Sequence, residues 1–201
     1  MNIARRTLLL SLTLPATAYA QADSPATPIA AFNAALLAGM RAGRAAPFAS
    51  RAAALRPSVE RAFDLPAILQ ASVGPRFAGF TEVARRTLLD AFTAFTVATW
   101  AGNFDTHGGE TFEVSPQTRA IGDDQVVSTR IVPATGEPTR LDYVMRKGAN
   151  GWKAIDILLN GTISRVAVQR SDFRALVAGG DPAPLLASLR ARAASLAGAA
   201  P

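Results

Sequence analysis

The chain has 201 residues, no cysteine, one histidine and a formal net charge of +6, and 49% of its residues are hydrophobic. The absence of cysteine excludes a disulfide scaffold, and a single imidazole argues against a zinc site, so we predict neither a metal nor a cofactor. The positive charge is mild, and no basic run is interleaved with aromatic residues, which argues against nucleic acid as a partner.

The first twenty residues have the features of a secretory signal peptide. A basic pair, Arg5-Arg6, precedes a short apolar run, and Ala18-Tyr19-Ala20 forms a small-x-small cleavage site. The apolar run is too short to span a bilayer. We therefore predict a cleaved signal peptide over residues 1–20 and an exported chain, with general secretion and twin-arginine export both open. Residues 21–28 are small and polar and predict a flexible lead-in.

Apolar residues recur at helical spacing through the first half of the mature chain. They predict four helices, at 29–41, 47–63, 65–73 and 82–103. Asp64 and Thr81 are the expected N-caps of the last two helices. The apolar face of the longest helix includes Leu88, Phe92 and Phe95, and its breadth indicates that this helix covers a large apolar partner.

After residue 110 the apolar period changes to two, which predicts strands at 111–115, 125–132, 139–147 and 152–159. Short turns join these strands, as in an antiparallel meander. One face is apolar and the other is largely polar, which is typical of a sheet that helices cover on one side. The positions assigned to the apolar face are Val127, Thr129, Ile131, Leu141, Tyr143, Met145, Ile155, Ile157 and Leu159.

Two further helices are predicted at 164–177 and 182–196, followed by a frayed tail at 197–201. The predicted fold is α+β: a curved antiparallel meander of four strands, possibly five, covered on one face by helices, in a cystatin-like or nuclear-transport-factor-like cone. Residues 29–196 are expected to form a single domain.

The chain contains one candidate catalytic cluster, Asp105 and His107 beside Glu110. A carboxylate with a histidine could act as a general base. The segment is rich in glycine and matches no nucleophile motif, so a solvated loop is the favoured interpretation and we do not expect an enzyme.

The apolar face has two interpretations, because a core and a pocket wall use the same residue types. Helical counting also places Arg170 in line with Val166 and Phe173. A buried guanidinium requires a partner. An internal ion pair with Asp156 is favoured, a ligand phosphate at a pocket entrance is the alternative, and extension of the side chain to the surface is a third possibility.

The stretch GWKAIDILLNGTISRVAVQRSDF, residues 151–173, resembles the signature of the MlaC family of exported lipid-binding proteins, also called toluene-tolerance auxiliary components. The matching positions are Gly151, Trp152, Lys153, Asp156, Gly161, Ser164, Arg170, Phe173 and Gly179-Gly180. Segments 63–74, 80–104 and 141–147 also resemble family elements. The Gly-Thr-Ile-Ser turn and Gln169 depart from the common pattern and are more similar to the hopanoid-associated HpnM branch.

This resemblance implies a monomeric periplasmic carrier that exchanges a membrane lipid, a phospholipid or a hopanoid, with inner- or outer-membrane transport complexes, as an auxiliary component of an ABC transporter. It implies a lipid cavity between the sheet and the helices. The candidate cavity residues are Phe80, Leu88, Phe92, Phe95, Val127, Thr129, Ile131, Leu141, Tyr143, Met145, Ile155, Ile157, Leu159, Val166 and Phe173. A small exported enzyme using Asp105 and His107, or a ligand-free envelope assembly protein, are the alternatives.

Overall fold

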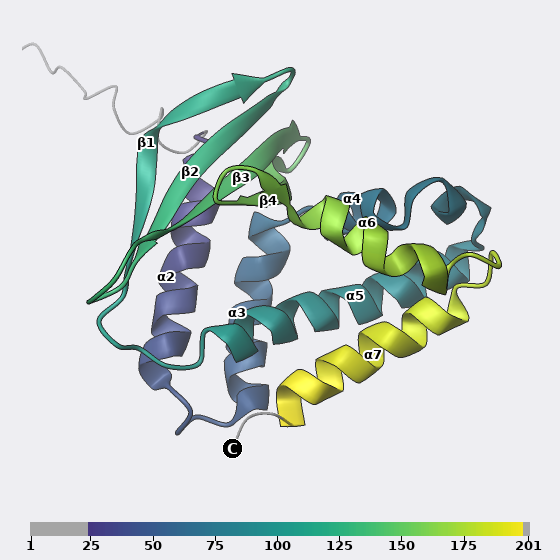
Figure 1. Cartoon of the computed structure of the whole chain (residues 1–201), viewed down its shortest axis with the longest axis horizontal. Coiled ribbons are helices and arrows are strands. Elements are labelled where there is room, and N and C mark those ends of the chain that lie inside the picture. The colour runs from purple at the N-terminus through teal and green to yellow at the C-terminus, as the bar shows by residue number, and fades with distance from the viewer. Residues whose placement is uncertain (1–23, 199–201) are drawn as a thin grey trace, which may run out of the picture.

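The computed structural model describes residues 24–198 and combines helices with one curved antiparallel sheet, so the predicted α+β class is confirmed (Figure 1). The predicted signal peptide, residues 1–20, lies outside the described residues. In chain order the elements are α2 (Ala26–Ala42), α3 (Phe48–Ala62), α4 (Leu65–Val73), the 3-10 helix η1 (Gly74–Gly79), α5 (Glu82–Asn103), β1 (Thr111–Ile121), β2 (Asp124–Val132), β3 (Thr139–Gly148), β4 (Gly151–Leu159), β5 (Ile163–Ser164), α6 (Arg165–Leu176) and α7 (Ala183–Gly198).

Local capping sets the starts of several helices. The Asp64 side chain accepts a hydrogen bond from the Ala67 N–H at 3.1 Å, and Thr81 Oγ1 accepts one from the Ala84 N–H at 3.2 Å, so both predicted N-caps are confirmed. Helix α2 begins at Ala26, inside the predicted lead-in. Ser24 explains the earlier start, because its Oγ accepts a hydrogen bond from the Ala26 N–H at 3.3 Å. At the other end, α7 continues to Gly198, into the predicted tail.

The sheet has five strands in the order β1-β2-β3-β4-β5, and all neighbours are antiparallel. The fifth strand is short: Ile163 and Ser164 pair with the end of β4. Strand β1 continues to Ile121, beyond the predicted end at residue 115. Its register shifts between Val114 and Thr118, a stretch that contains Pro116, which has no N–H for a ladder hydrogen bond.

The register defines the inner face of the sheet and corrects one predicted position. Val127 lies opposite Tyr143, and Tyr143 lies opposite Ile157, so these three side chains form one inner row. A bulge then shifts the alternation of β4, because Val144 pairs with Asp156 whereas Met145 pairs with Ala154. Ile155 is the extra residue. It was predicted to point inward with its neighbours, but the fully buried Ala154 occupies the inner position instead.

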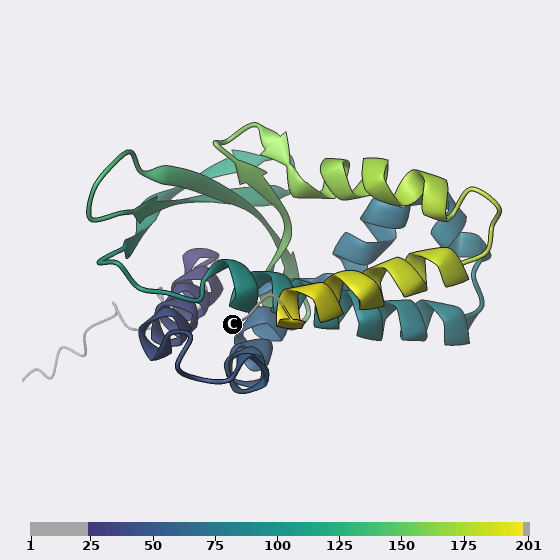
Figure 2. The same ribbon diagram turned by 60° about the horizontal axis from the view of Figure 1, so that its bottom comes forward.

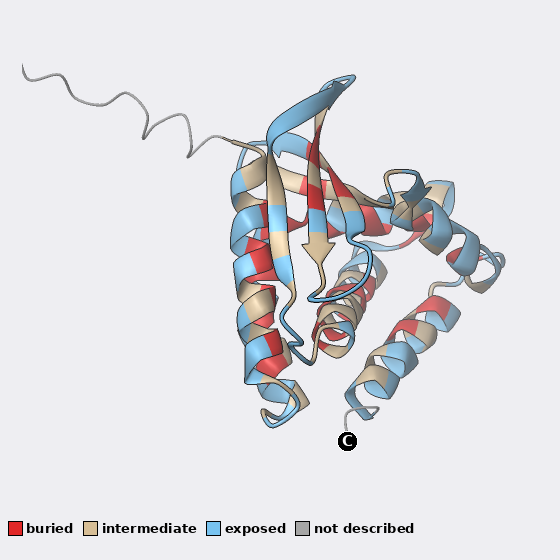
Figure 3. Ribbon diagram, turned by 60° about the vertical axis from the view of Figure 1, so that its left-hand side comes forward, coloured by how far each residue is buried: buried red, intermediate tan, exposed pale blue. Residues whose placement is uncertain are grey.

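Helices α2, α3 and α5 pack against the inner face of the sheet through an aromatic cluster, which consists of Phe32, Phe63, Trp100 and Tyr143. The ring centroids of Phe32 lie 5.1 Å from Phe63 and 4.9 Å from Trp100, both edge-to-face, and those of Phe63 and Tyr143 lie 6.1 Å apart. Figure 3 shows the buried residues gathered on the inner sides of the helices and strands. Edge-to-face contacts add to the burial of these large side chains, so the four rings form a closely packed cluster beneath the sheet.

Beyond the sheet the helices form two layers, with α4 and α6 in one and α5 and α7 in the other (Figure 2). Helix α7 buries Leu185 and Leu189, whereas α6 buries only Phe173. Helix α6 therefore buries fewer residues than α2 or α3, which bury five each. Within residues 24–198, no helix is long and apolar enough to cross a membrane.

Candidate functional site: an apolar pocket between sheet and helices

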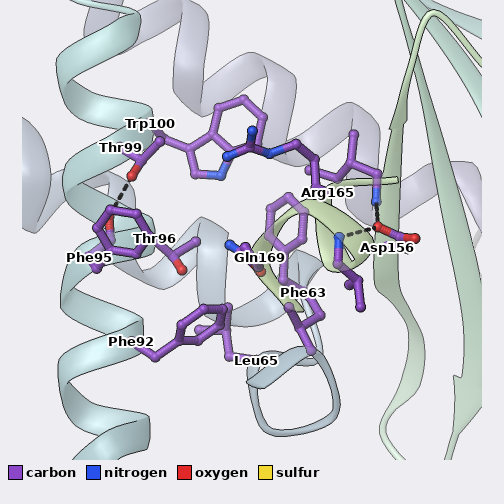
Figure 4. A pocket seen from close by; sticks show the side chains of 13 residues that line it. Phe63, Leu65, Phe92, Phe95, Thr96, Thr99, Trp100, Asp156, Arg165 and Gln169 are labelled. Carbon is purple, nitrogen blue, oxygen red and sulfur yellow. Dashed lines mark hydrogen bonds between the residues drawn. The ribbon is translucent and has the colours of Figure 1, made fainter. Parts of the chain in front are cut away.

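A pocket lies where β4 meets α4, α5 and α6 (Figure 4). Its cavity volume is about 80 Å³. The lining residues are Phe63, Leu65, Ile68, Phe92, Phe95, Thr96, Thr99, Trp100, Asp156, Ile157, Arg165, Val166 and Gln169. The wall is mostly apolar with a few polar groups, which is the usual composition of a small-molecule binding site.

Two of the polar side chains in the pocket have partners within the protein. Thr99 Oγ1 donates to the Phe95 carbonyl at 2.8 Å, one helical turn earlier. Gln169 Oε1 accepts a hydrogen bond from Ser72 Oγ at 3.0 Å, which joins α6 to α4. Because these atoms are already hydrogen-bonded, the wall that they form presents mainly carbon to a ligand.

Asp156 holds the N-terminus of α6 at the edge of the pocket. Its Oδ1 accepts hydrogen bonds from the N–H groups of Ile157 at 2.7 Å and Val166 at 3.0 Å, and its Oδ2 accepts one from Ser164 Oγ at 2.5 Å. Ser164 Oγ in turn accepts a hydrogen bond from the Ala167 N–H at 2.9 Å. A carboxylate and a cap at a helix N-terminus satisfy free N–H groups and complement the helix dipole. Asp156 therefore positions α6 against β4.

The predicted ion pair between Arg170 and Asp156 is wrong. Arg170 is exposed, and its Nε donates to the Ala71 carbonyl near the end of α4 at 2.9 Å. The last carbonyls of a helix have no intrahelical partner, so they are ready acceptors for a guanidinium. Asp156 already accepts hydrogen bonds from its own strand and from the first turn of α6. Helical periodicity does not predict these contacts.

The predicted cavity residues fall into three groups. Four of them line the pocket: Phe92, Phe95, Ile157 and Val166. Seven are buried in the core away from it: Phe80, Leu88, Val127, Thr129, Tyr143, Met145 and Phe173. Four are half-buried outside it: Ile131, Leu141, Ile155 and Leu159. Burial also raises the pKa of the Tyr143 phenol above its usual range.

Other lining residues were not among the predicted ones. Thr96 and Trp100 follow Phe92 at successive intervals of four, so the helical period could have found them. Phe63 and Leu65 lie at the junction of α3 and α4, and Arg165 begins α6. No periodic signal connects these three residues, because only the tertiary fold brings them together.

Asp105 and His107 lie outside this pocket. Asp105 forms an ion pair with Arg44 at 2.7 Å. His107 is exposed, and its Nε2 makes a 3.1 Å hydrogen bond with the Glu110 carbonyl. The N–H groups of Glu110 and Gly108 lower the pKa of the Glu110 carboxyl. The part of the chain from 24 to 198 contains no group of three acidic, histidine or cysteine side chains that could hold a metal ion.

The fold and the pocket define a class: an α+β protein with an apolar pocket between an open antiparallel sheet and its covering helices. Residues 31–191 match the family model described as MlaC protein, so the chain belongs to the MlaC family. The structure is also similar to that of the phospholipid-binding protein from Ralstonia solanacearum, solved in complex with a phospholipid. That match has a TM-score of 0.72 and 24% sequence identity over 89% of this chain and 98% of the other. No curated protein matches the sequence significantly.

Proposed function

We propose that this protein is a periplasmic lipid carrier that encloses the apolar part of a membrane lipid and shuttles it between membrane transport complexes. The apolar pocket between β4, α5 and α6 is the observation on which the proposal rests. Membership of the MlaC family and the phospholipid bound to the similar Ralstonia solanacearum protein support it. A phospholipid and a hopanoid are the two candidate cargoes.

Such a carrier needs an apolar cavity that excludes water, and it does not need to catalyse a reaction. Moving a buried methylene into water costs about 0.8 kcal/mol, so a bare acyl chain of about sixteen carbons costs about 13 kcal/mol. Aromatic and aliphatic side chains offset this cost when they enclose the chain. Because transport of this kind requires no nucleophile or general base, the proposal is a non-enzymatic function.

The cavity must widen to receive a lipid tail. Its volume of about 80 Å³ is far below the ~300–1,000 Å³ typical of ligand pockets. Helix α6 is the wall that we expect to move, because Phe173 is its only buried residue. The Ser72–Gln169 and Arg170–Ala71 hydrogen bonds tie α6 to α4. These two helices would therefore move together, away from α5.

The first test is to purify residues 21–201 without detergent, extract the protein with organic solvent and identify the extract by mass spectrometry. We expect about one lipid per protein, and its mass distinguishes a phospholipid from a hopanoid. A protein that carries no lipid and takes none from phospholipid or hopanoid vesicles would contradict the carrier function.

A pocket-filling variant tests the location of the cargo. Thr96→Phe places an aromatic ring in the cavity and should sharply lower the lipid content while the protein stays folded. Thr87→Phe is the matched control, because Thr87 lies on the same helix but does not line the pocket. Equal lipid content in the two variants would place the cargo elsewhere.

A further inference from the structure

Arg165 is the one cation among the described residues that line the pocket. It is the first residue of α6, its side chain is exposed, and Figure 4 shows that it extends from α6 toward the Trp100 side of the pocket. We call the end of the pocket at Arg165 its mouth. A positive charge therefore lies where an apolar cavity meets water.

The guanidinium of Arg165 has no hydrogen bond or ion pair with any residue in the described range 24–198. Three arginines on the strands of the sheet do have ion-pair partners. Arg130 pairs with Glu113 at 2.6 Å, Arg140 with Asp142 at 2.7 Å, and Arg146 with Asp124 at 2.7 Å. Arg165 is thus available to a ligand, whereas these three arginines already have carboxylate partners.

The nearby carboxylate forms no ion pair with Arg165. Asp156 also lines the pocket, but both of its oxygens accept hydrogen bonds from Ile157, Ser164 and Val166. The N-terminus of α6 offsets about half an elementary charge of this carboxylate. The same bonds fix the start of the helix, so they also fix the point from which the Arg165 side chain projects.

We propose that Arg165 binds the phosphate of a lipid headgroup at the mouth while the acyl chains lie among the apolar residues. This inference rests on the proposed lipid-carrier function and narrows its cargo. A guanidinium offers a fork of N–H donors that fits phosphate oxygens in a bidentate way. The arrangement selects lipids with a phosphate over uncharged lipids, so it favours a phospholipid over a hopanoid without phosphate.

The test is competitive uptake from vesicles that contain phosphatidylglycerol and diacylglycerol with identical acyl chains. After the protein is separated from the vesicles, mass spectrometry gives the ratio of the two bound lipids. We expect the wild type to prefer phosphatidylglycerol, and Arg165→Gln to lower this preference about tenfold by removing a charge-assisted contact. Arg174→Gln is the control, because Arg174 is an exposed arginine on the same helix that does not line the pocket.

The possible outcomes separate the inference from the function beneath it. If Arg165→Gln takes up both lipids in the wild-type ratio, the assignment of Arg165 is overturned and the carrier function stands. If the wild type takes up neither of these lipids, the headgroup assignment is overturned, and the carrier function also fails when hopanoid vesicles give no uptake. Thermal unfolding of both variants, monitored by circular dichroism, checks that each remains folded.

A free anion could in principle use the same contact, so lipid-free protein is also titrated with inorganic phosphate. We expect weak binding that adds little to the preference. Binding of inorganic phosphate as tight as that of phosphatidylglycerol, and lost in Arg165→Gln, would define a site for the free anion and overturn the headgroup assignment.

Discussion

The region beneath the sheet and the region bordered by α6 differ in how many large side chains they bury. Beneath the sheet, Phe32, Phe63 and Tyr143 are almost fully buried and their rings contact one another. Helix α6 buries only Phe173 and borders the pocket. The comparison indicates that the aromatic cluster contributes more to stability than α6 does, and that α6 is the less firmly held wall of the pocket.

Helix α5 belongs to both regions. Trp100 packs against Phe32 in the aromatic cluster and also lines the pocket, next to Phe95 and Thr96. A wall that is anchored in the core cannot move without disturbing the packing of that core. The opposite wall, α6, buries only Phe173 and is hydrogen-bonded to α4, so we expect it to move together with α4 at lower cost.

The largest expected effect comes from opening a cavity in the aromatic cluster. Phe32→Ala should destabilise the protein by about 3–5 kcal/mol, because a fully buried ring is lost and the surrounding side chains relax only in part. Urea unfolding followed by circular dichroism measures the change. Phe77→Ala in η1, where the ring is half-buried, serves as control and should cost clearly less. Similar losses at the two sites would contradict the contrast between the two regions.

Next in size is the loss of the anchor of α6. Asp156→Ala removes the acceptor of three hydrogen bonds and should cost about 2–3 kcal/mol. Hydrogen exchange should become faster in α6 while α5 stays protected. Asp172→Ala is the control on α6, since its contact with Arg192 is 3.5 Å long and exposed and should contribute less than about 0.5 kcal/mol. If hydrogen exchange in α6 is unchanged after Asp156→Ala, Asp156 does not anchor this helix.

A smaller, stabilising effect is expected at Asn33 on α2. This side chain is 4% exposed, and neither its amide nitrogen nor its oxygen has a hydrogen-bond partner within residues 24–198. Asn33→Leu has a similar shape and removes the desolvation penalty, so it should stabilise the protein by about 1–2 kcal/mol. Calorimetry should record a higher midpoint temperature of thermal unfolding, and the lipid content of the protein should be unchanged. A lower midpoint would indicate that an ordered water satisfies the amide.

The smallest effect is expected on the outer face of the sheet. Glu113→Gln breaks the pair with Arg130, in which both side chains are at least half-exposed. Exposed pairs contribute about 0.2–1 kcal/mol, and salt screens them. The loss in unfolding free energy should therefore be at the low end of this range and vanish at high ionic strength, without a change in lipid uptake. A loss that persists in high salt would show that the contact is not purely a surface ion pair.

Features set by local interactions could be predicted from the sequence. Asp64 and Thr81 cap their helices as expected, because capping depends on residues only three positions apart. The turn at Asn160 and Gly161 adopts positive φ angles of 52° and 76°, in keeping with the tolerance of asparagine and glycine for this conformation. Phe92 and Phe95 lie on the pocket side of α5, where the helical period placed them.

Features set by distant segments could not be predicted in this way. The bulge at Ile155 breaks an alternation that looks regular along β4, because it arises from pairing with β3. Arg170 and Asp156 both have partners that helical counting did not suggest, one at the end of α4 and the other in the first turn of α6. Arg165 carried no periodic signal at all, although it is the cation at the pocket.

By itself, the sequence determined the order and kind of the elements, the apolar face of the sheet and the resemblance to the MlaC family, since periodicity, capping and motif spacing are local properties. Only the tertiary structure decided which part of that apolar face is packed and which part borders a cavity. The physical reason is that filling depends on how side chains from β4, α4, α5 and α6 meet, and the same apolar residues can close a core or line a pocket.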